Sequence, residues 1–249
     1  MKKALLILFF INLGVMPSYT QESDNYQTSM GELTITPILH GSLILQLNDI
    51  TIYVDPYGGI QNYSSFSNPD MILITDIHGD HLNQKTLDGI DTSNAEFIVP
   101  SAVKEKLPKT YNSTVLNNGQ GVHRMGIFIE AVPMYNLPEE ENSRHPKGRG
   151  NGYLLTIGKT NIYISGDTED IEEMRRLRNI DIAFVCMNLP YTMSTDQAAS
   201  AVLDFQPKIV YPYHYRGKDG LSDVEGFKKR VEDENGSIQV KLRNWYPQD

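Results

Sequence analysis

Cysteine is almost absent from this sequence. Cys186 is the single cysteine among 249 residues, so the chain cannot form an internal disulfide bond. A structural zinc site built from several thiolates is excluded for the same reason. The fold must therefore depend on a hydrophobic core, and a hydrophobic content of 40% is sufficient to build one.

Basic residues are scarce relative to acidic ones. The chain has 22 lysines and arginines against 31 aspartates and glutamates, which gives a net charge of −9 at pH 7. Binding of nucleic acid depends on basic patches that neutralise phosphate groups. The composition therefore argues against a nucleic-acid partner, and we expect a small-molecule substrate. No feature of the sequence indicates an oligomeric state.

A long apolar segment occurs only at the start of the chain. Lys2 and Lys3 precede an apolar run over residues 4–16, and Ser18-Tyr19-Thr20 then places small residues at the usual cleavage offsets. This pattern predicts a secretory signal peptide over residues 1–20, because the run is short for a membrane span. We expect an exported protein, periplasmic or secreted, with no stable membrane anchor after the signal is removed. Without it, 229 residues remain and the net charge becomes −11, since two lysines are lost.

No repeat, low-complexity tract or linker divides the rest of the chain. Residues 21–30 are polar and predict a flexible N-terminus. Residues 31–249 are predicted to form one domain, because single α/β domains commonly reach roughly 200 to 250 residues.

Strand-type patterns dominate the first part of this domain, and strands alternate with helices from residue 71 onward. Pro37 lies inside the first strand pattern, so that strand is expected at a sheet edge or with a bulge. Helices are predicted over residues 169–177 and from a capping box at Ser194 to Phe205. Two β-rich halves that each end in helices predict the α/β class. We expect a four-layer αββα sandwich, with two mixed sheets packed face to face and helices outside.

Histidine and aspartate are concentrated at one strand end. An apolar strand pattern over residues 71–74 is followed by the sequence Thr-Asp-Ile-His-Gly-Asp-His at residues 75–81. Imidazole and carboxylate groups are ligands of zinc, iron and manganese. The four histidine and aspartate side chains of this segment cannot converge from a regular strand or helix, so the segment is predicted to be an irregular loop. Gly79 would give that loop its freedom.

Three further candidate ligands lie at or between the ends of predicted strands. Asp167 and His214 each follow a strand, and His145 lies in a polar loop between two strands. Taken singly, each has another interpretation. Asp167 could cap a helix, His214 could be a satisfied core residue, and His145 could be a solvated loop residue.

Taken in order, these residues resemble the metallo-β-lactamase superfamily, and they are most similar to its ascorbate-phosphate lactonase-like branch. The motifs that carry the resemblance are Asp76-x-His78-x-Asp80-His81, His145, Ser165-Gly166-Asp167-Thr168 and His214. The resemblance extends from about residue 33 to residue 215, nearly the whole expected domain. It implies a metallo-β-lactamase-like domain that acts as a metal-dependent hydrolase.

The resemblance also implies two divalent metal ions, expected to be zinc, with manganese or iron as alternatives. One ion would be held at a first subsite and the other at a second subsite, with Asp167 bridging both ions. The first subsite comprises Asp76, His78 and His145, and the second comprises Asp80, His81 and His214. Asp76 departs from the family pattern, which has histidine at this position. A carboxylate there makes the site less positive and could alter its preference for metals.

The implied chemistry is attack by a metal-bound hydroxide on an ester, lactone, amide or phosphodiester, with Asp80 as the catalytic residue that orients the hydroxide and receives its proton. Two alternatives remain. A non-catalytic metal- or ligand-binding protein on the same fold would be consistent with Asp76, because replacement of a ligand can accompany loss of activity. An iron-dependent oxidoreductase would be consistent with the many carboxylates.

Several neighbouring residues have two interpretations each. The basic loop residues Arg144, Lys147 and Arg149 could attract an anionic group, or they could be a solvated basic loop. Tyr213 and Tyr215 could donate hydrogen bonds to a developing oxyanion, or could only pack. His40 could hold a metal ligand in position or be structural, and His123 has no companion and is interpreted as incidental.

Overall fold

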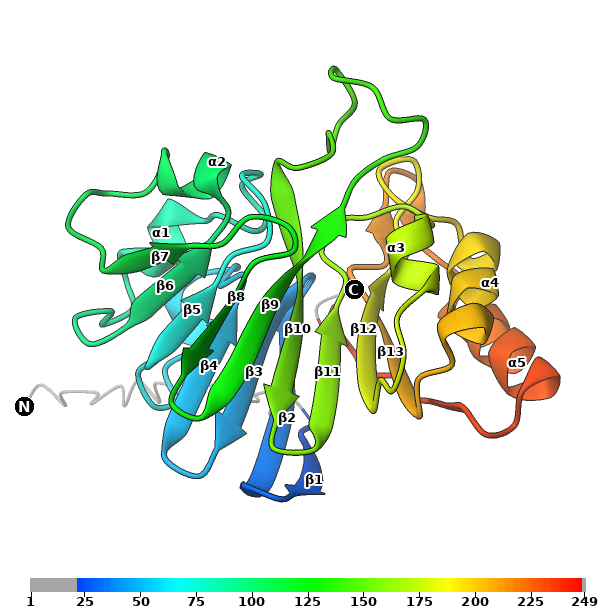
Figure 1. The fold of residues 1–249 in the computed structure, drawn as a ribbon, viewed down its shortest axis with the longest axis horizontal. Coiled ribbons are helices and arrows are strands. Elements are labelled where there is room, and N and C mark those ends of the chain that lie inside the picture. The colour runs from blue at the N-terminus through cyan, green and yellow to red at the C-terminus, as the bar shows by residue number, and fades with distance from the viewer. Residues whose placement is uncertain (1–21, 248–249) are drawn as a thin grey trace, which may run out of the picture.

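The computed structural model describes residues 22–247 and shows two seven-stranded sheets that lie face to face (Figure 1). Both sheets are mixed, because antiparallel hairpins at one side continue into parallel strands at the other. The first sheet contains, in spatial order, β1 (Asp24–Thr28), β2 (Gly31–Leu39), β3 (Ser42–Leu47), β4 (Ile50–Val54), β5 (Met71–Leu73), β6 (Glu96–Val99) and β7 (Ser113–Val115). The second contains β16 (Gln239–Val240), β13 (Ile209–Tyr213), β12 (Ile182–Cys186), β11 (Thr160–Ile164), β10 (Gly150–Ile157), β9 (Ile127–Met134) and β8 (Gly121–Arg124).

Helices lie outside the two sheets and complete the predicted four layers. The helices α1 (Gln84–Leu87) and α2 (Ser101–Lys104) lie beside the first sheet, and α3 (Glu172–Arg175), α4 (Thr195–Phe205) and α5 (Val224–Glu234) cover the second (Figure 1). A short 3-10 helix, η1 (Ile60–Asn62), and a hairpin of β14 (Arg216–Gly217) and β15 (Gly220–Leu221) lie in the loops. The fold-class prediction is confirmed. Within residues 22–247, no helix is both long enough and apolar enough to cross a bilayer.

The core follows from the alternation of side chains along each strand. Leu45 of β3 belongs to the main apolar cluster, which includes strands of both sheets, whereas its neighbour Ile44 belongs to a separate cluster. That second cluster contains Leu87 of α1 and Val103 of α2, so it lies on the outer face of the first sheet. Because side chains alternate between the two faces of a strand, one apolar strand supplies both cores.

The N-terminal segment differs from its prediction. Residues 24–28, expected to be flexible, form β1 and pair with β2 in an antiparallel register. Asp24 is buried there, and its carboxylate lies 2.7 Å from Lys241 Nζ and 2.6 Å from Arg243 Nη2. This long-range ion pairing fixes the segment, and local sequence could not indicate it. The predicted signal peptide over residues 1–20 lies outside the described residues.

Pro37 is accommodated by a bulge and not by an edge position. β2 lies between β1 and β3, and its register with β3 shifts between Pro37 and Leu39. Pairing with β1 already ends at Ile35. The missing N–H of Pro37 therefore removes no hydrogen bond on the β1 side.

Candidate functional site

The structure brings all seven predicted ligands together at one end of the two sheets. The irregular loop after β5 carries four of them, and Asp167 and His214 follow β11 and β13. His145 comes from the long loop between β9 and β10, which projects beyond the sheets (Figure 1). With His40, five of the six histidines in the sequence lie in this cluster.

The second subsite has the arrangement of a metal site. His81 Nε2 lies 3.2 Å from Asp167 Oδ2, and His214 Nε2 lies 3.4 Å from Asp167 Oδ1. Both histidines and Asp167 are almost completely buried. The two Nε2 atoms and Asp167 Oδ1 nevertheless make no hydrogen bond of suitable geometry to any described residue. Buried polar atoms are rarely left without partners, so these atoms fit a cation held between them.

Asp80 and His145 extend this arrangement on either side. Asp80 Oδ2 lies 3.5 Å from His214 Nε2, and the Asp80 side chain is 31% exposed, so the site is open to solvent there. His145 is fully buried, and its Nε2 lies 3.2 Å from Asp167 Oδ2. Asn136 fixes the position of His145, because its side-chain oxygen accepts the backbone N–H of His145 at 2.8 Å. Asp167 thus lies between the two subsites, where the resemblance places a bridging carboxylate.

The first subsite is arranged differently. Asp76 is fully buried, and its Oδ1 and Oδ2 accept hydrogen bonds from Arg149 at 3.1 and 2.9 Å. Asp76 Oδ2 also lies 2.7 Å from His78 Nδ1. Two of the three predicted ligands of this subsite therefore contact each other, and a guanidinium group is bound to one of them.

The electrostatics of the cluster keep its carboxylates ionised. Burial alone would raise the pKa of Asp80, but hydrogen bonds from His214 and His40 hold that pKa well below its usual range. Burial would also raise the pKa of Asp167, but the charges of His214 and His81, together with the side-chain contacts of His145 and His81, hold that pKa well below its usual range. For His81, burial lowers the pKa, whereas Asp167 and Asp55 raise it well above its usual value. An anionic cluster of this kind favours binding of a cation.

Two orienting residues were not predicted from the sequence. Asp55, at the end of β4, lies 2.8 Å from His81 Nδ1 and accepts the backbone N–H of Thr75 at 2.8 Å. Asn188 lies 2.8 Å from His214 Nδ1. Each contact engages Nδ1 and leaves Nε2 directed at the cluster. The carboxylate contact of His81 is the one by which metal-binding histidines are usually oriented, whereas Nδ1 of His214 faces the amide nitrogen of Asn188. The only sequence feature that could have indicated a role for Asp55 is its position between the end of a predicted strand and Pro56.

His40 supports the site and is not merely part of the core. Its Nε2 lies 3.2 Å from Asp80 Oδ2, and its Nδ1 lies 2.6 Å from the Tyr246 hydroxyl. Its ring centroid is 3.8 Å from that of His214. Burial, together with the charge of His214, lowers the pKa of His40 to about 4. His123 is not a member of the cluster and packs against Phe128 on β8 and β9.

The backbone near the site holds several residues in the left-handed region. His40, Asp55 and His214 have φ values of 61°, 44° and 47°, which non-glycine residues rarely adopt. Gly41 is required by packing, because a Cβ atom there would lie 2.8 Å from His214 Cδ2.

Gly79 differs from its predicted role. Its φ is not positive, and a Cβ atom would meet nothing within 4 Å.

Of the two interpretations of Tyr213 and Tyr215, the structure favours packing. The Tyr213 hydroxyl accepts the backbone N–H of Gly166 at 2.9 Å, and the Tyr215 hydroxyl donates to the carbonyl of Arg243 at 3.2 Å. Both side chains are buried. Their hydrogen bonds stabilise the loops that carry Asp167 and His214.

The basic loop residues already have partners of their own. Lys147 pairs with Glu139 at 2.9 Å and with Glu173 at 3.3 Å. The Arg144 guanidinium lies 4.4 Å from the centroid of the Tyr191 ring. Arg149 binds Asp76, so this loop is built around internal contacts.

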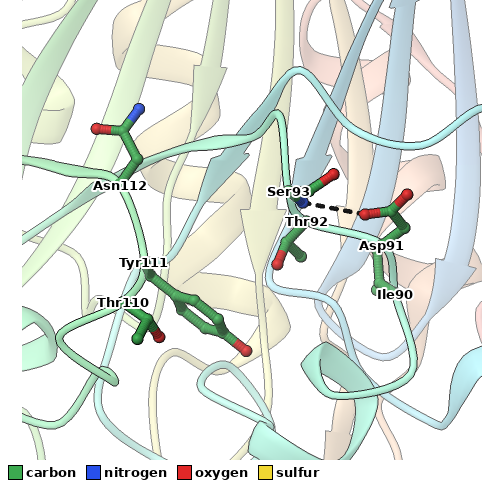
Figure 2. A pocket seen from close by; sticks show the side chains of 7 residues that line it. All are labelled: Ile90, Asp91, Thr92, Ser93, Thr110, Tyr111 and Asn112. Carbon is green, nitrogen blue, oxygen red and sulfur yellow. Dashed lines mark hydrogen bonds between the residues drawn. The ribbon is translucent and has the colours of Figure 1, made fainter.

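A separate pocket lies between the loops that follow α1 and α2 (Figure 2). The hydrogen bond drawn as a dashed line in Figure 2 joins the backbone N–H of Ser93 to the Asp91 carboxylate at 3.1 Å. No residue of the metal cluster lines this pocket, which is formed by Ile90, Asp91, Thr92, Ser93, Thr110, Tyr111 and Asn112.

Comparison with known proteins gives consistent results. The family model described as "Beta-lactamase superfamily domain" matches residues 34–214. A UPF0173 metal-dependent hydrolase of Pyrococcus horikoshii is 30% identical over 183 residues, which cover 71% of this chain and 80% of the relative. A relative of the same description from Methanosarcina mazei is 28% identical, over 82% of this chain and 92% of its own.

Solved structures agree with this comparison. A protein of Parabacteroides distasonis, provisionally described as a metal-dependent hydrolase, is 41% identical with a TM-score of 0.81, and the match covers 91% of this chain and all of that one. Igni18 from Ignicoccus hospitalis is 22% identical with a TM-score of 0.73, over 84% of this chain and 94% of that one, and shows the same fold. The family model covers well over half of the sequence, and the fold and the ordered motifs agree with it. The chain therefore belongs to the metallo-β-lactamase superfamily.

Proposed function

We propose that this protein is a metal-dependent hydrolase whose chemistry takes place at the second subsite. The observation that carries the proposal is a set of three buried atoms that could bind a metal ion and that make no hydrogen bond. They are Nε2 of His81, Nε2 of His214 and Oδ1 of Asp167. The names of its relatives support the same class, because those from Pyrococcus horikoshii and Methanosarcina mazei are described as metal-dependent hydrolases.

A divalent ion bound by these residues would lower the pKa of a water ligand to about 7 and polarise an oxygen atom of the substrate. Two imidazoles and two carboxylates suit zinc, and they also suit manganese or iron. The resemblance implies two ions. The unpaired donor atoms support an ion at the second subsite, whereas Asp76 in the first subsite is already paired with Arg149.

Asp80 is the proposed catalytic residue. Its pKa lies well below the usual range, so the carboxylate is ionised at neutral pH and can accept a hydrogen bond from the attacking water. His40 holds the other side of this carboxylate at 3.2 Å. Asp80 would thereby orient the water toward a carbonyl or phosphorus centre, and its lowered pKa makes it a weak acceptor of the proton.

The substrate is proposed to be a small ester, lactone, amide or phosphodiester. Access is supported by the partial exposure of His78 and Asp80, whose side chains are 27% and 31% exposed. Export to the periplasm or the medium is part of the proposal and rests on the sequence of residues 1–20 alone.

The test is hydrolysis of a panel of these four substrate types before and after chelation. We expect chelated protein to lose activity and added zinc to restore it. His81→Ala should lower kcat/KM by more than about 100-fold, because a ligand is removed from the centre. His123→Ala, which removes a histidine outside the cluster, should retain wild-type activity. Hydrolysis that survives chelation would contradict the proposal.

The same preparation separates hydrolysis from iron-dependent oxidation. Elemental analysis and a visible absorption spectrum identify bound iron directly. Iron with an absorption band and no hydrolytic activity would favour the oxidoreductase.

A further inference from the structure

Asp76, which stands where the family pattern has histidine, is bound by Arg149 and contacts His78. Arg149 binds the Asp76 carboxylate through two donors, Nε at 3.1 Å and Nη2 at 2.9 Å. Such fork-shaped pairs are among the strongest side-chain hydrogen bonds. Asp76 is fully buried, so this pair is shielded from solvent.

Arg149 is also fixed from the other side. Its Nη2 donates to the backbone carbonyl of Arg144 at 2.6 Å and lies 3.5 Å from His78 Nε2. Its side chain is 20% exposed. The loop between β9 and β10 therefore delivers a guanidinium group to the first subsite in a defined position.

The geometry within this subsite suits hydrogen bonding better than metal binding. Asp76 Oδ2 and His78 Nδ1 are 2.7 Å apart, whereas two ligands of one tetrahedral zinc ion are separated by roughly 3.3 Å. Both oxygens of Asp76 and Nδ1 of His78 are thus engaged. His145 and the shared Asp167 are then left with open atoms, and two ligands are fewer than the three or four that zinc sites use.

The positive charge of Arg149 also argues against a metal ion in the first subsite. Arginine stays protonated at any ordinary pH, so a divalent ion in the first subsite would lie beside a fixed positive charge. The guanidinium itself neutralises Asp76. Among the ion pairs of the described chain, none joins an arginine to the second subsite. His81, His214 and Asp167 there each have an atom without a hydrogen-bond partner.

We propose that this protein binds one metal ion per chain, at the second subsite, and that the Asp76–Arg149 pair takes the place of the second ion. The inference rests on the proposed function for the presence of a metal, and it changes the number of ions that the resemblance implies. His78 would then hold Asp76 in place and would not bind metal.

The test is metal content per chain, measured by mass spectrometry after saturation with zinc and removal of unbound metal. Wild-type protein should hold one zinc ion. The double variant Asp76→His/Arg149→Met restores a histidine and removes the guanidinium, so it should hold two. Lys147→Met removes a neighbouring cation that does not contact Asp76 and should remain at one.

Each outcome has a distinct meaning. Two ions in the wild type would overturn the inference and leave the proposed hydrolase intact. A folded double variant that still holds one ion would overturn it as well, because the pair would not be what closes the first subsite. No bound ion in the wild type would overturn the proposed function together with the inference.

Discussion

One buried carboxylate, Asp55, determines how His81 is directed. Asp55 contacts Nδ1 of His81 at 2.8 Å, and Asp167 lies 3.2 Å from its Nε2. The imidazole thus lies between an orienting group and the metal subsite. This is the usual carboxylate–histidine–metal arrangement.

The variant Asp55→Asn tests this orienting role. Its amide cannot replace both contacts of the carboxylate, so zinc affinity should fall by about 10- to 100-fold, measured by competition with a chromogenic chelator. Asp88→Asn removes an exposed carboxylate directly after α1 and should leave the affinity unchanged. Unchanged affinity in Asp55→Asn, with folding intact by circular dichroism, would contradict the role.

For single residues, the sequence predicted which candidate ligands come together but not which residues hold them in place. The residues of the loop after β5 lie close together along the chain, and their types suit metals. Asp55, Asn188 and Arg149 reach the site only through folding, from β4, from the loop after β12 and from the loop before β10. No local pattern could pair Arg149 with Asp76, because 73 positions separate them.

Among the elements, β1 shows how a polar segment becomes part of the sheet. Its Asp24 is buried against Lys241 and Arg243, close to the C-terminal end of the chain. Burial would raise the pKa of Asp24, but hydrogen bonds from Arg243 and Lys241 lower it below its usual value. The ionised form therefore stabilises the fold.

Asp24→Asn should lower the free energy of unfolding by about 3 kcal/mol at pH 7, as expected when one partner of a buried ion pair is removed. A depressed pKa gives stability that is present above the pKa of the unfolded state, near 3.9, and is lost as the pH falls through the folded-state value. The difference between wild type and variant should therefore shrink in acid, as urea unfolding at several pH values can show. Glu22→Gln, an exposed carboxylate 3.5 Å from Arg243, should cost less than about 1 kcal/mol. Equal effects of both substitutions would contradict the account.

Elements with strong local signals were predicted well. α4 begins after the Ser194 capping box and ends at Phe205, as predicted. Both its cap and its apolar face depend on residues that are close together in the sequence. By contrast, the helix predicted over residues 169–177 is shortened to Glu172–Arg175. Residues before it are engaged elsewhere, since the backbone N–H of Glu169 donates to Tyr135 O at 2.9 Å.

For the molecule as a whole, two sheets meet at one end to assemble the site. β5 from the first sheet and β11 and β13 from the second each lead into a loop that carries ligands. This layout was predictable, because the strand patterns and the order of motifs agree with one fold. The single metal ion that we propose could not be predicted from the sequence, because the proposal depends on the contact between the distant residues Asp76 and Arg149.

The most direct test of the account is a crystal structure of the zinc-loaded protein with an anomalous difference map recorded at the zinc edge. We predict a single peak per chain, about 2.0 to 2.2 Å from Nε2 of His81, Nε2 of His214 and a carboxylate oxygen of Asp167. Arg149 should remain bound to Asp76 in the same crystals. An empty second subsite, or a peak between Asp76, His78 and His145, would contradict the account.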